Sequence, residues 1–172
     1  MPKTEIGKVG VLLIDDHKMF AESLARLLDG ENDIDVLAVT DGGSDAVVLA
    51  ERLEPDVMIV DYYLPGQNGV ELIAAIKATH PKIKAILLTA STDDRLLLEA
   101  VAVGCSGFLT KDRAAHEVAV AVRSVVAGGA PVSPPILARL FPMLTRADQS
   151  SDRCLTQDER EVVAALLRQL LK

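Results

Sequence analysis

The sequence predicts an α/β protein whose core is a five-stranded parallel sheet covered by helices on both faces. Short, continuous apolar segments recur five times along the chain. A segment with apolar residues at helical spacing follows each of them. The apolar segments do not alternate with polar residues, and such strands are typical of a parallel sheet buried on both faces.

The first two strand and helix units lie within the first 55 residues. Residues 9–14 (VGVLLI) form the first strand, and a helix with apolar spacing follows until Gly30. Residues 34–39 form the second strand, and residues 42–45 open a helix that runs through Leu53 and is ended by Pro55. Ser44 is predicted to be the N-cap of this helix.

Three further units complete the sheet. Residues 57–60 form a buried strand that ends in Asp61, and a Pro65-Gly66 turn leads through Gly69 to a helix that stops before Pro81. Residues 83–89 form the fourth strand, and a helix over residues 94–103 follows it. Residues 105–109 form the fifth strand, and after residues 110–112 an amphipathic helix runs through Val126. Right-handed crossovers between five such strands favour the flavodoxin-like, doubly wound order 2-1-3-4-5.

The character of the chain changes after this sheet. We expect a first domain over residues 7–128, a proline-containing linker over 129–153, and a helical segment over 154–172. Thr156 and Glu159 have the spacing of a capping box at the start of that last helix. Its apolar stripe must be buried on the first domain, on a second copy, or on further sequence.

Composition excludes several classes of function. The 172 residues carry a net charge of −7, made up of −8 in residues 1–130 and +1 in the remainder, so the first domain should repel nucleic acid. No apolar run approaches the roughly 20 residues of a membrane span, and the first ten residues lack a signal sequence, so a cytoplasmic protein is expected. Cys105 and Cys154 are predicted to be free thiols, one of them buried in a strand. The three histidines share no spacing and are expected to be solvated or locally bonded: His17, His80 and His116.

Polar residues gather where the predicted strands end: Asp15, Asp16, Asp61, Thr89 and Lys111. Three carboxylates at one sheet edge repel one another unless a divalent cation or an ammonium group offsets their charge. Mg²⁺ suits such oxygen ligands beside a phosphate. Asp61 would then act as a carboxylate nucleophile, Lys111 would pair with the incoming phosphoryl group, and the Thr89 hydroxyl would donate to it. The product would be an aspartyl phosphate.

These residues resemble the receiver domain of bacterial response regulators, which has the CheY-like version of the predicted fold. The resemblance covers residues 9 to about 127 and is carried by the acidic pair, by Asp61 with its Leu-Pro-Gly loop, by Thr89-Ala90, and by the segment GFLTK that ends in Lys111. It implies that Asp16 and Asp61 bind Mg²⁺ directly, that Asp15 helps through water, and that the backbone carbonyl of Tyr63 completes the protein ligands. It also implies that Phe108 is an aromatic switch residue coupled to Thr89.

Local sequence narrows the resemblance to the NarL/LuxR class. The segments IDDHKMFAESLARLL and FLTKD are similar to that class, and LTQDEREVV resembles the opening of its DNA-binding domain. That domain needs four helices, and the sequence stops within the first, so the helix-turn-helix segment is either truncated or atypical. The class implies phosphorylation by a sensor histidine kinase and a homodimer through the helix 4, strand 5, helix 5 face or the C-terminal helix. It implies DNA binding only with a complete helix-turn-helix, and no enzymatic activity beyond self-catalysed phosphotransfer and slow autodephosphorylation.

Three alternatives are weighed against this hypothesis. A haloacid-dehalogenase-type phosphohydrolase needs a second Asp two positions after its nucleophile, where this chain has Tyr63. A flavodoxin-like cofactor module needs a phosphate cradle after the first strand, where Asp15 and Asp16 would repel a phosphate. A receiver-like module that binds partners without being phosphorylated stays open, although all five family positions are intact.

Overall fold

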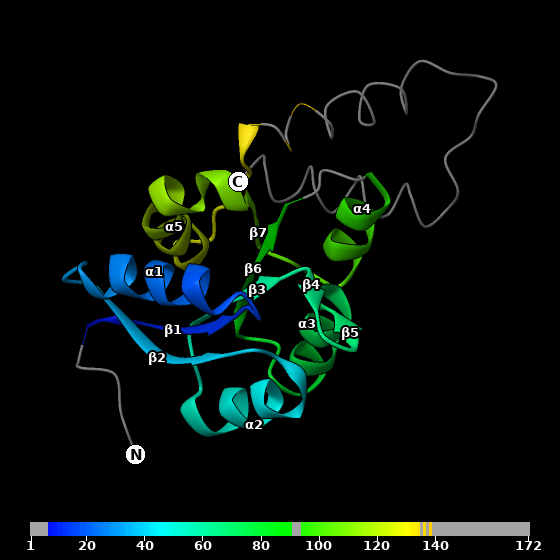
Figure 1. Ribbon diagram of the computed structural model, residues 1–172, viewed down its shortest axis with the longest axis horizontal. Helices are drawn as coiled ribbons and strands as arrows, with labels where there is room; N and C mark the ends of the chain where they lie inside the picture. The colour runs from blue at the N-terminus through cyan, green and yellow to red at the C-terminus, as the bar shows by residue number, and fades with distance from the viewer. Residues whose placement is uncertain (1–6, 91–93, 135, 137, 139–172) are drawn as a thin grey trace.

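A computed structural model describes residues 7–90, 94–134, 136 and 138 (Figure 1). Five strands form one parallel sheet in the order β2-β1-β3-β6-β7, which confirms the predicted fold class and strand order. The strands of this sheet are β1 (Val9–Ile14), β2 (Ile34–Thr40), β3 (Val57–Asp61), β6 (Lys84–Thr89) and β7 (Gly107–Thr110). The helices are α1 (Lys18–Asp29), α2 (Gly43–Leu53), α3 (Gly69–Thr79), α4 (Asp94–Ala102) and α5 (Lys111–Val126).

Helices cover both faces of the sheet (Figure 1). On one face, apolar residues of α1 and α5 pack against Val11 and Leu13 of β1. On the other face, α2, α3 and α4 pack against Leu12 and Ile14 of the same strand. Neighbouring residues of β1 therefore enter opposite halves of the core, as the pleat of a strand requires. This two-sided burial explains why the strands read as continuous apolar segments.

The loop after β3 is more ordered than the sequence suggested. A two-residue hairpin, β4 (Tyr63–Leu64) with β5 (Gln67–Asn68), lies between β3 and α3. Asn68 caps α3: its side chain accepts from the Glu71 backbone N–H at 2.8 Å, and the Glu71 carboxylate accepts from the Asn68 backbone N–H. This capping box fixes where the loop ends and the helix begins.

Gly69 packs directly against the residue at the end of β3. A Cβ at this position would lie 2.1 Å from the Asp61 carbonyl oxygen and 2.9 Å from its carbonyl carbon. The backbone N–H of Gly69 also donates to the Tyr62 carbonyl at 2.7 Å. Only a residue without a side chain lets the start of α3 approach the backbone of Asp61 so closely.

Two local predictions are corrected. Ser44 is not the N-cap of α2: the helix begins at Gly43, its N-cap is Gly42 at φ +109°, and no side chain caps it. Glycine can adopt that conformation without strain, so the chain enters the helix earlier than a Ser cap would require. Cys105 is buried and unpaired, as predicted, but it precedes β7 instead of lying in it. Cys154 and the helix predicted over residues 154–172 lie outside the described residues.

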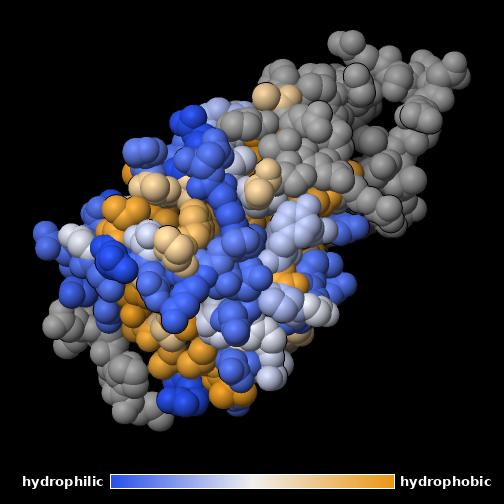
Figure 2. All heavy atoms as spheres, in the orientation of Figure 1, coloured by the Kyte–Doolittle hydropathy of each residue, from blue (hydrophilic) through white to orange (hydrophobic). Residues whose placement is uncertain are grey.

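The surface is mixed. Figure 2 shows hydrophobic atoms gathered over α1 and α5 among charged residues. The large apolar side chains exposed on these two helices are Met19, Leu27, Val120 and Val126. Among the helices described, none is both long enough and apolar enough to cross a bilayer.

Candidate functional site

The sheet brings the predicted polar residues to one edge. Asp15 directly follows β1, Asp61 is the last residue of the neighbouring strand β3, and Lys111 is the first residue of α5 after β7. Asp15 and Asp61 are almost fully buried, at 2% and 1% exposed. The carboxyl ends of parallel strands meet at one edge of a sheet, which is why residues so far apart in sequence converge.

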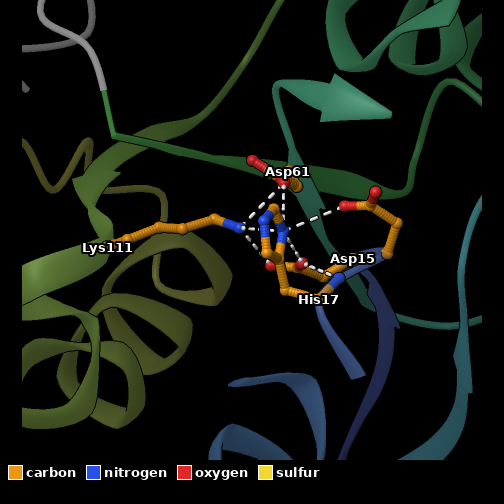
Figure 3. A network of polar contacts seen from close by, with 5 residues as sticks. Asp15, His17, Asp61 and Lys111 are labelled. Atoms are coloured by element: carbon orange, nitrogen blue, oxygen red, sulfur yellow. Dashed lines mark hydrogen bonds and ion pairs between the residues drawn. The ribbon is translucent and has the colours of Figure 1, made fainter. Parts of the chain in front are cut away.

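The Lys111 ammonium group lies between the two buried carboxylates (Figure 3). Its Nζ donates a hydrogen bond to Asp61 Oδ2 at 2.8 Å and forms an ion pair with Asp15 Oδ2 at the same distance. It also lies 4.9 Å from the centroid of the Phe20 ring, within the range of a cation–π contact. An ammonium group was one of the two kinds of charge expected to offset the carboxylates, and Lys111 does so directly for Asp15 and Asp61.

Burial and neighbouring charges shift the pKa values of Asp61 and Lys111. The pKa of Asp61 is raised, first because burial disfavours its charged form and also because Asp15 is close, while the Lys111 hydrogen bond opposes the rise. Burial acts to lower the pKa of Lys111, but the contacts with Asp15 and Asp61 outweigh it and raise that pKa overall. Lys111 therefore stays protonated, and its positive charge is available to an anionic ligand.

The carboxylate oxygens leave capacity for a cation. Asp61 Oδ1 and Asp15 Oδ2 are buried and accept no hydrogen bond, although Asp15 Oδ2 makes the ion pair with Lys111. Four side chains offer ligand atoms that all lie within 4.8 Å of one another: Asp15, Asp16, His17 and Asp61. Buried oxygen acceptors of this kind need a partner. The acidic pocket can therefore hold a metal ion.

His17 is the residue of this site that the sequence did not identify. Its Nδ1 lies 2.9 Å from Asp16 Oδ1, 3.2 Å from Asp15 Oδ1 and 3.6 Å from Asp61 Oδ2. The ring is 63% exposed and locally bonded, as predicted. It also belongs to the acidic cluster of possible metal ligands, whereas the lack of a shared spacing among the histidines had argued against a histidine in a metal site. The signal that could have identified it is its position directly after the acidic pair.

The remaining predicted residues lie around the same edge. Thr89 ends β6 and is fully buried, and Phe108 in β7 is 1% exposed. Leu87 pairs with Phe108 across the two strands and both enter the same half of the core, so Thr89, two residues along, faces that side as well. Tyr63, in β4, has an exposed side chain and lines a pocket of about 200 Å³ together with Asp61 and Lys111.

Relatives of this chain are transcriptional regulatory proteins. LnrK of Bacillus subtilis is 35% identical over 133 residues, which are 77% of this chain and 60% of LnrK. DegU of Brevibacillus brevis is 31% identical over 155 residues, which are 90% of this chain and 63% of DegU. The chain thus spans less than two thirds of the length of either relative.

Structural comparison reaches the same class of protein. The signal receiver domain of the response regulator NarL from Mycobacterium tuberculosis superposes with a TM-score of 0.67 at 31% identity. The match covers 70% of this chain and 98% of that domain. Residues 11–123 match the response regulator receiver domain. The chain therefore belongs to the response regulator receiver domain family, and its relatives are response regulators of the NarL/LuxR type.

Proposed function

We propose that this protein is the phosphorylated component of a two-component system and that Asp61 accepts the phosphoryl group from a sensor histidine kinase. One observation carries the proposal. Asp61 is a buried carboxylate at the open end of β3, with one oxygen bonded to Lys111 and the other without a hydrogen-bond partner. A carboxylate held in this way can act as a nucleophile toward a phosphorus atom.

The chemistry assigns a task to each side chain. A carboxylate oxygen of Asp61 forms a bond to phosphorus while the bond from phosphorus to the donor's nitrogen breaks, and the product is an aspartyl phosphate. The Lys111 ammonium, 2.8 Å from Asp61 Oδ2, is close enough to neutralise charge on the transferred group. The Thr89 hydroxyl would donate to another phosphoryl oxygen.

Mg²⁺ is the cofactor we propose for the acidic pocket. Asp16 and Asp61 would hold it directly, the Tyr63 backbone carbonyl would complete the protein ligands, and Asp15 would act through water. When bound, the ion neutralises negative charge on the phosphoryl oxygens and on the carboxylates. The buried Asp61 Oδ1, which accepts no hydrogen bond, supports this assignment, because a hard cation would give it a partner.

Thr89 and Phe108 are proposed as the switch. Both lie on neighbouring strands and face the half of the core that contains α4. A movement of Thr89 toward a phosphoryl group would change the space available to the Phe108 ring. The face formed by α4, β7 and α5 would then change its affinity for a second copy.

Output through transcription is proposed for the complete protein. Its support is the class of the relatives, which are named transcriptional regulatory proteins. Binding to DNA would require a complete helix-turn-helix. The linker over residues 129–153 and the segment 154–172 would connect the receiver domain to that output.

Acetyl phosphate and Mg²⁺ provide the direct test. Intact-mass measurement of the 172-residue chain should show an adduct of one phosphoryl group, and light scattering should show a rise in molar mass on phosphorylation. Asp61→Asn should abolish the adduct, since an amide is neither a comparable nucleophile nor an anionic ligand. Asp35→Asn is the matched control: Asp35 pairs with Gly10 near the opposite end of the sheet, so labelling should persist.

Each outcome separates the two hypotheses about this fold. An adduct that depends on Asp61 supports a competent receiver. No adduct on the wild-type chain would favour the phosphorylation-independent interaction module. An adduct with unchanged molar mass would count against dimerisation through the α4, β7 and α5 face.

A further inference from the structure

The chain returns to the edge of the sheet after α5. The Phe108 backbone N–H donates to the Pro131 carbonyl at 2.8 Å, and the Ser133 backbone N–H donates to the Phe108 carbonyl at 2.9 Å. Val132 thereby forms a parallel bridge with Phe108. The outer hydrogen-bonding groups of Phe108 in the edge strand β7 are thus satisfied by the segment that leads out of the domain.

Side chains fix this segment in place. Ile136 is fully buried in the same half of the core as Phe108, and its backbone N–H donates to the Ser133 carbonyl at 2.9 Å. A Cβ on Gly107 would lie 3.0 Å from Pro131 Cγ, so the segment approaches β7 closely. Residues 131–134 and Ile136, here named the docked linker, are therefore packed against the receiver domain, with Ser133 and Ile136 buried in it.

The Ser133 hydroxyl connects the docked linker to the start of α5. It accepts from the Thr110 backbone N–H at 3.3 Å and donates to Glu117 Oε2 at 2.8 Å. Ser133 is 1% exposed, so both bonds are sheltered from water. Burial acts to raise the pKa of Glu117, but its hydrogen bonds to Ser133 and Arg113 outweigh this and lower it, which keeps Glu117 charged as an acceptor.

Thr110 is directly followed by Lys111, the residue whose ammonium group contacts Asp61. The side chain of Thr110 makes no capping bond at the N-terminus of α5. A hydroxyl from another segment, that of Ser133, instead accepts the Thr110 backbone N–H. The backbone from which the Lys111 side chain extends is thus held from the docked linker.

We propose that Ser133 is a positioning residue for Lys111, and that docking of the linker on β7 is coupled to phosphoryl binding at Asp61. The inference rests on the proposed function and adds to it the route from the site to the segment that leaves the domain. Coupling of this kind is reciprocal: if a docked linker favours the bound state, the bound state favours docking by the same factor.

Calorimetry on the full chain tests whether Ser133 positions Lys111. The measured quantity is the affinity for beryllium fluoride in the presence of Mg²⁺. Ser133→Ala should weaken binding by about five-fold or more, the lower end of typical coupling between sites. Ser133→Thr, which keeps the hydroxyl, should bind more tightly than Ser133→Ala. Glu117→Ala, which removes the acceptor without altering the linker, should weaken binding in the same direction. Ser23→Ala is the matched control, because that hydroxyl bonds only to the Met19 carbonyl on the exposed side of α1.

Hydrogen exchange tests whether ligand binding at Asp61 in turn favours docking of the linker on β7. Beryllium fluoride should slow exchange of the Phe108 and Ser133 backbone amides in the wild-type chain by the same factor, and should leave them unchanged in Asp61→Asn. A merely structural role of Ser133 would lower thermal stability without this ligand-dependent protection.

The outcomes distinguish the two proposals. Wild-type chain that binds no beryllium fluoride would overturn the proposed function and this inference with it. The inference alone would be overturned by either of two results, given wild-type binding that depends on Asp61. One is a Ser133→Ala affinity equal to that of the wild type, and the other is amide exchange that does not change on binding. Weakened binding together with ligand-dependent protection supports it.

Discussion

Lys111 donates a hydrogen bond of 2.8 Å to Asp61, although 50 residues separate them in the sequence. The same ammonium group pairs with Asp15, so one positive charge serves two buried carboxylates. In the absence of a cation, this lysine is the closest positive charge that offsets their repulsion. The stability of the domain and the chemistry proposed for the site therefore depend on the same side chain.

Replacement of Lys111 by methionine should destabilise the domain. The Lys111 side chain is only 17% exposed, and removal of one partner from a buried ion pair typically costs about 3 kcal/mol. We expect a lower thermal midpoint in EDTA, and a larger stabilisation by Mg²⁺ than in the wild-type chain, since the ion would replace the lost charge. Thermal unfolding followed by circular dichroism measures both effects.

Lys82→Met removes an exposed lysine and is the control for this change. Its midpoint and its response to Mg²⁺ should match those of the wild-type chain. Equal Mg²⁺ stabilisation in Lys111→Met and wild type would show that the ammonium group and the ion do not share the carboxylates.

Asp61→Asn should make the domain more stable at neutral pH while it abolishes phosphorylation. The pKa of Asp61 is raised in the folded state, mainly by burial and also by Asp15, so the folded protein holds this proton more tightly than the unfolded chain. The protonated Asp61 carboxyl therefore contributes stability below pH 3.8, and this contribution is lost as pH rises through the raised pKa. At neutral pH the wild-type chain no longer has it. The amide stays neutral throughout, so a gain on the order of 1 kcal/mol is expected.

The pH dependence provides the check on this prediction. Midpoints of wild type and Asp61→Asn should converge as pH falls below 3.8, where the wild-type carboxyl is protonated in both states. Asp35→Asn should show no comparable gain at neutral pH. A variant less stable than wild type at neutral pH would mean that the Lys111 contact outweighs the burial of the Asp61 charge.

Much of the fold and the convergence of the site could be predicted because both follow from short-range patterns. Continuous apolar strands separated by helices leave few topologies, and parallel strands bring their carboxyl ends together. The sequence alone thus assigns Asp15, Asp61 and Lys111 to one edge of the sheet. The family positions then gave each residue an expected role.

The features that escaped prediction depend on tertiary contacts or on competing local signals. Ser44 has the chemistry of an N-cap, but the glycine conformation at Gly42 starts the helix earlier. Asn68 and Glu71 have the spacing of a capping box, which was not identified in the sequence. The bonds of Ser133 join segments that are 16 and 23 residues apart, and no periodicity in the sequence indicates them.

Gly69→Ala should distort the loop that joins Asp61 to α3. The new Cβ would lie 2.1 Å from the Asp61 carbonyl oxygen, so either the start of α3 or the end of β3 must shift. Such overpacking costs about 1–3 kcal/mol, and displacement of Asp61 should slow labelling by acetyl phosphate as well. Gly30→Ala is the control, since its Cβ would meet no atom closer than 3.3 Å. A Gly69→Ala chain with wild-type stability and labelling would mean that the loop tolerates displacement.

Arg123 joins α5 to the turn before β2, and its replacement should reveal a charge-dependent contribution to stability. The guanidinium contacts both carboxylate oxygens of Asp33, at 2.7 and 2.6 Å, and also Glu31. The Arg123 hydrogen bonds lower the pKa of Asp33 against the opposing effect of burial, so this contribution is present above pH 3.8 and is lost as pH falls through the lowered pKa. Arg123→Gln should therefore reduce the thermal midpoint at neutral pH by less than Lys111→Met does. The difference from wild type should shrink in high salt and disappear in acid. Arg26→Gln is the control: it breaks one exposed ion pair with Glu22 at 3.6 Å and should lower the thermal midpoint less. If the thermal midpoint of Arg123→Gln stayed below that of the wild type in acid, the cause would be lost packing of the arginine stem.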